Sequence, residues 1–142
     1  MRENLFRGKR RDNGEWVYGS LFVGFKKSYI CPEAIAMYNF DGALCLGGFV
    51  EVSPESVGQY TGLKDKHGKK IFEGDILLLD DIKGIVNYGT GCFCVKLPSP
   101  DYLYRNNPAI DMVLNEYPGL EIIGNIHDNP ELLLESKEEC NT

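Results

Sequence analysis

The carboxylates best suited to chemistry crowd one short stretch of the sequence, at Glu73, Asp75, Asp80 and Asp81. Paired carboxylates can bind Mg²⁺ or act as acid and base. Residues 73–81 contain no basic or nucleophilic side chain that could act with them. Asp75 follows Gly74 at an expected strand entry, where a short carboxylate accepts bonds from local backbone amides. We therefore interpret this group as structural.

The soft ligands for a metal are few. His67 and His127 are the two imidazoles, and Cys92 and Cys94 are spaced unlike the CxxC knuckle of zinc sites. Five cysteines, an odd number with no CxxC pair, indicate reduced thiols rather than a disulfide framework. We expect no metal and no cofactor, and we expect Cys92 and Cys94 to face the interior as small apolar residues.

The sequence lacks the commoner signatures of enzymes. It has neither a GxGxxG nor a GxxxxGK[ST] phosphate loop, and no GxSxG elbow. We therefore predict no catalytic residues, and an enzyme without a recognised motif is the third hypothesis for function.

Two basic segments combine cations with aromatic residues, one within residues 1–27 and one within residues 64–70. Cations beside stacking aromatics are what single-stranded nucleic acids require. The candidate nucleic-acid-binding residues are Arg7, Lys9, Arg10, Arg11, Trp16, Tyr60, Lys64, Lys66, Lys69 and Lys70. The alternative is that the lysines solvate a surface while Trp16 packs inside. Sequence-blind duplex binding is disfavoured, because the net charge is −6 and the carboxy-terminal third is acidic.

A tyrosine-rich stretch near residues 98–119 suits a contact surface for a protein partner. The candidate residues are Tyr102, Tyr104, Ile110, Met112, Val113 and Tyr117. The alternative is that these side chains cover one end of the fold. The basic start and the acidic end of the chain also suit self-association, so a homo-oligomer remains open.

The elements that must position these residues are mostly short strands. Asp12-Asn13-Gly14 predicts the turn of an amino-terminal hairpin, and Ser53-Pro54 predicts one helical or 3₁₀ turn. Strands are expected at 28–31, 35–40, 43–52, 74–79, 84–88, 92–97 and 120–126, an ordered loop or small hairpin at 59–70, and helices at 108–116 and 129–136.

The composition fits one mainly β domain. Hydrophobic residues at 43% and aromatics at 11% can build one packed core, and 16 Gly with 7 Pro provide frequent turns. We expect a small barrel or sandwich, SH3-like or OB-like in character, because long exposed strand edges invite aggregation. The expected parts of the single domain 1–142 are a basic hairpin (1–27), a barrel core (54–97 and 120–127), an insertion (98–119) and a short helix with an acidic tail (128–142).

Four blocks of the sequence resemble the YopX-like family of phage and prophage proteins. They are Phe6-Arg7-Gly8-Lys9, Trp16-Val17-Tyr18-Gly19, residues 57–76 and residues 120–133. The resemblance implies a β-rich domain that acts in the host cytoplasm, in agreement with the lack of a membrane-length apolar run or signal peptide. It implies no reaction. The leading hypothesis is a non-catalytic accessory or protein-interaction module, and the alternative is a small barrel that binds single-stranded nucleic acid.

Overall fold

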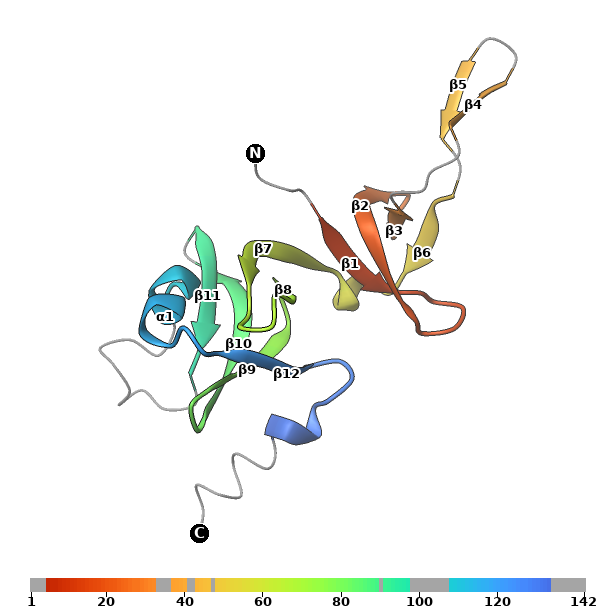
Figure 1. Ribbon diagram of the computed structural model, residues 1–142. Coiled ribbons are helices and arrows are strands. Elements are labelled where there is room, and N and C mark those ends of the chain that lie inside the picture. The colour runs from red at the N-terminus through yellow and green to blue at the C-terminus, as the bar shows by residue number, and fades with distance from the viewer. Residues whose placement is uncertain are drawn as a thin grey trace. The chain divides into compact units, whose positions relative to one another are not determined.

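The computed structural model describes residues 5–32, 37–40, 43–46, 48–89, 91–97 and 108–133, with the backbone alone for 37–40 and 43–46. The chain divides into two compact units, residues 1–60 and residues 61–142, and each is described by itself. Figure 1 shows the strands and the helices of each unit.

The first unit is an antiparallel sheet with the strand order β6-β3-β2-β1-β7. Its elements are β1 (Phe6–Lys9), β2 (Trp16–Gly24), β3 (Lys27–Pro32), β6 (Val50–Val52), the 3₁₀ helix η1 (Pro54–Ser56) and the first part of β7 (Gly58–Lys64). A separate pair, β4 (Met37–Phe40) and β5 (Ala43–Leu46), lies between β3 and β6 in the sequence. The predicted 3₁₀ turn after Ser53 is confirmed.

The amino-terminal hairpin is confirmed, and its turn follows from the side chains predicted to make it. Phe6 pairs with Gly19 and Lys9 pairs with Trp16 across β1 and β2. The Asn13 Oδ1 accepts a hydrogen bond from the Glu15 backbone N–H at 2.9 Å, and Gly14 adopts a φ of 74°. Asn followed by Gly fits such a turn because both residues tolerate a positive φ.

Two glycines of this hairpin are required by close approach. A Cβ at Gly8 would lie 2.9 Å from the Cβ of Val52, and one at Gly19 would overlap the carbonyl oxygen of Cys31. Val52 is fully buried, and the Ser53 N–H donates to the Lys9 carbonyl at 2.9 Å, so β6 lies against the end of β1. A side chain at Gly8 would push β1 away from β6, and one at Gly19 would push β2 away from β3.

The second unit contains a four-stranded antiparallel sheet with the order β11-β10-β9-β12. Its elements are the rest of β7, β8 (Lys70–Phe72), β9 (Asp75–Leu79), β10 (Ile82–Gly89), β11 (Cys92–Lys96), α1 (Ile110–Glu116) and β12 (Glu121–Asn125). The core joins the sheet to α1 and consists of Ile71, Leu77, Leu79, Val86, Phe93, Val95, Leu97, Ile110, Val113 and Leu120. The predicted meander, helix and last strand are confirmed.

The stretch 59–70, expected as an ordered loop or small hairpin, forms the hairpin: β7 and β8 are hydrogen-bonded neighbours, and the Asp65 N–H donates to the Lys69 carbonyl at 2.9 Å in the loop between them. β7 runs through Gly58–Lys64 and is tied to β8, because the Thr61 hydroxyl donates to the Ile71 carbonyl at 2.9 Å. Gly62 has a φ of 89° within β7. The mainly β class is confirmed. The sheets formed by the described residues are not closed into a barrel.

Candidate functional site: an exposed aromatic hairpin

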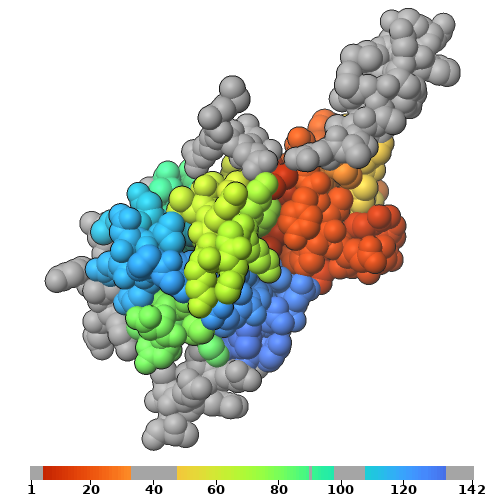
Figure 2. Space-filling model, in the orientation of Figure 1, coloured from red at the N-terminus to blue at the C-terminus, as the bar shows by residue number. Residues whose placement is uncertain are grey.

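Exposed apolar side chains gather around the β2–β3 hairpin of the first unit. Eight large hydrophobic side chains are exposed among the described residues, and, besides Tyr18 farther along β2, four of them lie toward the turn end of this hairpin: Phe22 (47%), Val23 (66%), Phe25 (91%) and Phe49 (43%). We call Phe22, Phe25 and Phe49 the hairpin surface, since Val23 follows Phe22 on β2 and points to the opposite face of the strand. β2 and β3 belong to the orange part of the space-filling view (Figure 2). Such a concentration of exposed rings is a feature of binding surfaces.

The turn that carries Phe25 is unusual for its sequence. Phe25 and Lys26 have φ values of 53° and 63°, so two consecutive bulky residues adopt the left-handed conformation. Each such residue costs about 1–2 kcal/mol relative to ordinary backbone, and hairpin turns of this kind prefer Asn-Gly. The sequence therefore keeps a strained turn that exposes a phenyl ring.

The rings below the tip support one another. The Phe22 ring centroid lies 6.1 Å from that of Tyr29 on the facing strand and 5.7 Å from that of Phe49 beside β6. Phe22 and Tyr29 are direct cross-strand partners. Tilted rings at these separations attract one another. The hairpin surface thus includes two rings of a packed aromatic cluster, which consists of Phe22, Tyr29 and Phe49.

Cations border the hairpin surface. Lys26 is exposed and makes no ion pair among the described residues. Lys27 Nζ lies 3.8 Å from Glu51 Oε1, and Arg11 Nε lies 3.5 Å from Glu51 Oε2. One glutamate therefore faces two cations, and the border keeps a net positive charge.

The predicted nucleic-acid-binding residues of the first unit collect around Trp16. The Arg7 guanidinium lies 4.6 Å and the Lys9 ammonium 5.6 Å from the Trp16 ring centroid, both within cation–π range. Arg7 is 6% exposed, and Tyr60 is buried as well. The charges of Arg7 and Lys9 thus interact with the Trp16 ring of the same chain.

Arg10 is engaged by an acidic neighbour. Its guanidinium makes two hydrogen bonds to the Asp12 carboxylate, at 2.9 and 2.8 Å. The side-chain hydrogen bond to Asp12 raises the pKa of Arg10, and the same bond lowers the pKa of Asp12. An anionic ligand at Arg10 would compete with this pair.

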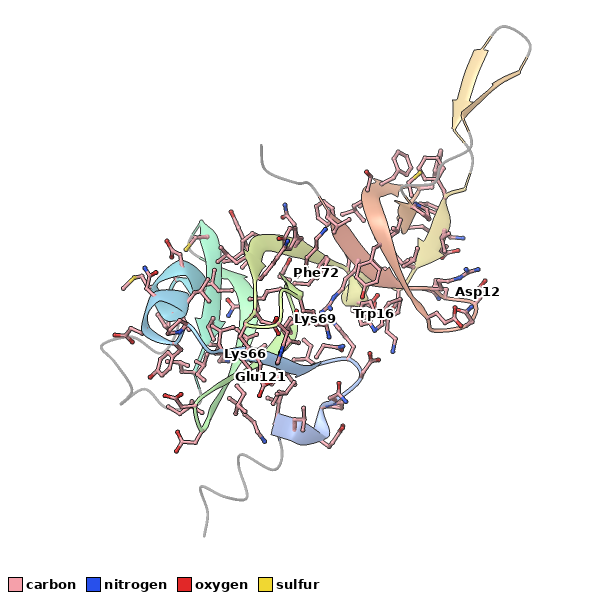
Figure 3. All side chains as sticks on the ribbon, viewed as in Figure 1. Asp12, Trp16, Lys66, Lys69, Phe72 and Glu121 are labelled. Atoms are coloured by element: carbon pink, nitrogen blue, oxygen red, sulfur yellow. The ribbon has the colours of Figure 1, made fainter. Side chains whose placement is uncertain are left out.

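Of the predicted lysines in the second unit, Lys66 lies beside a carboxylate of β12. Lys64, Lys66 and Lys69 are exposed and Lys70 is half-buried. Lys66 Nζ lies 3.8 Å and His67 Nε2 lies 3.2 Å from Glu121 Oε2, and Figure 3 shows Lys66 beside Glu121. Part of this loop's positive charge therefore faces β12 of the same unit.

Asp65 holds that loop together. Its Oδ1 accepts the backbone N–H groups of His67 and Lys69 at 2.9 Å each, and its Oδ2 accepts that of Ile122 at 3.1 Å. Burial would raise the pKa of Asp65, but these three N–H donors outweigh burial and lower it. The carboxylate fastens the β7–β8 loop to β12.

Within the acidic stretch 73–81, Asp75 and Asp80 have places in tight turns of the second unit. Asp75 is 2% exposed, and its Oδ2 accepts the Phe72 backbone N–H at 2.7 Å across the turn at Glu73 and Gly74. Asp80 has a φ of 58° in the turn before β10. The described residues include no group of three or more His, Cys, Asp or Glu placed to hold a metal ion. The structural interpretation explains the positions of Asp75 and Asp80.

The predicted partner surface of the second unit is divided by burial. Ile110 and Val113 belong to the core, Tyr117 is half-buried against it, and Met112 is 60% exposed. Tyr102 and Tyr104 lie outside the described residues. Met112 is the described member of this set that is mostly exposed.

The sequence analysis missed the hairpin surface. The available signal was the alternation of Trp16, Tyr18, Ser20 and Phe22, which places aromatics on one face of β2. Phe25-Lys26 carries no turn signal, so its exposure could not be inferred from residue type.

A family model for the YopX protein matches residues 5–134, and so extends across both units. The chain belongs to the YopX protein family. Within this YopX chain, no described helix is long and apolar enough to cross a membrane. No curated protein matches it.

A crystal structure shares the fold of this YopX chain. Protein EF1440 from Enterococcus faecalis matches with a TM-score of 0.57 and 24% identity, over 94% of this chain and 99% of the other. Identity this low supports the fold alone. The fold therefore recurs along nearly the full length of both proteins.

Proposed function

We propose that this YopX chain is a non-catalytic accessory module of a phage or prophage that binds a protein partner in the bacterial cytoplasm. The observation that carries the proposal is the hairpin surface, where Phe25 is 91% exposed on a left-handed turn. Aromatic residues are enriched at protein interfaces, and lysines are tolerated at their rims. Phe25 at the tip with Lys26 and Lys27 beside it has this composition.

The free energies of ring burial and of backbone strain support a docking role for the β2–β3 turn. Burying one phenylalanine side chain contributes about 1.5–3 kcal/mol, whereas each left-handed bulky residue costs about 1–2 kcal/mol. In the free chain the turn at Phe25 and Lys26 bears this cost without burying the ring. A partner that covers Phe25 and Phe22 would offset the strain.

Site-specific photo-crosslinking tests the proposal. A photoreactive phenylalanine analogue replaces Phe25 in the full chain inside the bacterial host, and the control replaces Met112, which is also exposed. We expect one discrete heavier adduct from position 25 and none from position 112. An adduct with the mass of two chains would identify the protein partner as a second copy. Equal or absent crosslinking at both positions would contradict the proposal.

A second candidate function is the binding of single-stranded nucleic acid. It is favoured by Trp16 and Tyr18, which share one face of β2 with Tyr18 45% exposed, and by the half-buried Lys9 beside the Trp16 ring. The chain has one tryptophan, so its fluorescence reports on this place. Binding of labelled oligonucleotides that weakens with salt and quenches Trp16 would support this function. No anisotropy change at low or near-physiological salt would reject it.

A further inference from the structure

Two cysteines of the second unit lie side by side on β11. Cys92 and Cys94 alternate along the strand, so their side chains share the face opposite Phe93 and Val95, which belong to the core. Their sulfur atoms are 3.7 Å apart. Figure 1 shows β11 next to β10, at the edge of the four-stranded sheet.

The two thiols differ in access. Cys92 is exposed, whereas Cys94 is 1% exposed, with its Sγ 3.5 Å from the Gly89 carbonyl. Gly89 is the cross-strand partner of Cys92 and presents no side chain beside it. A small reagent can therefore reach Cys92 first, with Cys94 held directly behind it.

We propose that Cys92 and Cys94 form a reversible intramolecular disulfide, with Cys92 as the reacting thiol and Cys94 as the resolving thiol. The oxidant is a low-molecular-weight disulfide of the glutathione class. The Cys92 thiolate attacks one sulfur of this disulfide, its S–S bond breaks, and one small thiol leaves. The Cys94 thiolate then attacks the Cys92 sulfur in the mixed disulfide and expels the second small thiol. The protein dithiol loses two electrons, the small disulfide gains them, and the two departing thiolates take up the two protons of the protein thiols.

The strand spacing makes this bridge reversible. Residues two apart on an extended strand have Cα atoms about 6.6 Å apart, which is near the upper limit of about 6.8 Å for disulfides. Closing the bridge draws the two Cα atoms together and bends β11 at Phe93, the residue between the two cysteines. A bridge strained in this way is easily reduced, as are the disulfides that proteins use as switches. Cys31, in contrast, is buried within the first unit.

The test uses the purified full chain in buffers with increasing ratios of oxidised to reduced glutathione. Trypsin cleaves after Lys83 and Lys96, so residues 84–96 form one peptide that holds both thiols. We expect this peptide to lose two hydrogens as the ratio rises and to regain them with dithiothreitol. Accumulation of a glutathione adduct on Cys92, with no loss of hydrogens, would overturn the proposal.

Two nearly isosteric variants separate the roles of the thiols. In Cys94→Ser, Cys92 should retain glutathione because nothing resolves the mixed disulfide. In Cys92→Ser, the buried Cys94 should react roughly tenfold more slowly than Cys92 does in Cys94→Ser. Equal rates would contradict the assigned roles. Thermal melts confirm that both variants are folded before the comparison is made.

Discussion

Tight turns in the two units are built in opposite ways. Between β8 and β9 of the second unit, Gly74 takes the positive φ of 91° and the Asp75 carboxylate accepts the Phe72 N–H. Between β2 and β3 of the first unit, Phe25 and Lys26 take the positive φ values, and the Phe25 ring is 91% exposed.

The difference shows which turn serves stability. A glycine and a buried carboxylate satisfy the second unit's turn without strain or exposed apolar surface. Asp65 does the same for the β7–β8 loop. The β2–β3 turn has bulky residues where Asn-Gly would fold more easily, so we infer that binding, not stability, explains its sequence.

The largest expected effect comes from Asp75→Ala. Removing this carboxylate leaves the buried Phe72 N–H without the acceptor it has at 2.7 Å, so the second unit should lose about 2–4 kcal/mol of unfolding free energy. Urea unfolding measures the loss. The matched control is Asp81→Ala, an exposed turn carboxylate, which should stay within about 0.5 kcal/mol of the parent chain. Equal urea midpoints for both variants would show that the Asp75 carboxylate does not stabilise this turn.

Asp65→Asn should have a smaller effect that depends on pH. The folded pKa of Asp65 lies below the ordinary value, so its contribution is fully present above about pH 4 and is lost as the pH falls through the folded pKa. We expect the variant to be about 1–3 kcal/mol less stable at pH 7, where the carboxylate is charged. The gap should narrow in acid. Urea midpoints at pH 7 and pH 3 measure it, and a gap that widens in acid would refute the assigned role.

The smallest effect is expected from Glu121→Gln. Its carboxylate faces Lys66 and His67 at the surface, and such pairs contribute about 0–1 kcal/mol and weaken with salt. We expect a loss of no more than about 0.5 kcal/mol at low salt and almost none at 1 M salt. Urea midpoints at the two salt concentrations provide the measurement. A large, salt-independent loss would mean that this carboxylate, and not Asp65, fastens the loop.

Much of the fold could be predicted from residue types whose local preferences agree with the structure. Asn13-Gly14 fits a hairpin turn, Pro54 fits the start of a 3₁₀ helix, and Pro118-Gly119 ends α1. For residues 59–70 the sequence left an ordered loop and a small hairpin as alternatives, and the pairing of β7 with β8, a tertiary feature, decides for the hairpin.

The candidate site could be predicted less well for two reasons. Charge alone indicated the basic segments, but the partner that each cation takes depends on the folded geometry: Arg10 is held by Asp12, two residues along the chain, and Arg7 lies on Trp16 of the facing strand. Cys92 and Cys94 were both expected to face the interior; Cys94 is buried, although on the face of β11 opposite Phe93 and Val95, and Cys92 is exposed near the end of an edge strand. The strained Phe25-Lys26 turn has no sequence signal at all.

The most direct test of the binding role replaces the turn by its relaxed form, Phe25→Asn together with Lys26→Gly. The measurement is crosslinking to the partner from a photoreactive residue at Phe49, on the same hairpin surface, with urea unfolding of both proteins as the companion reading. We predict that the variant gains about 1 kcal/mol or more of stability and loses the adduct at position 49. An unchanged adduct in the stabilised variant would contradict the account, because the exposed ring would then have no part in binding.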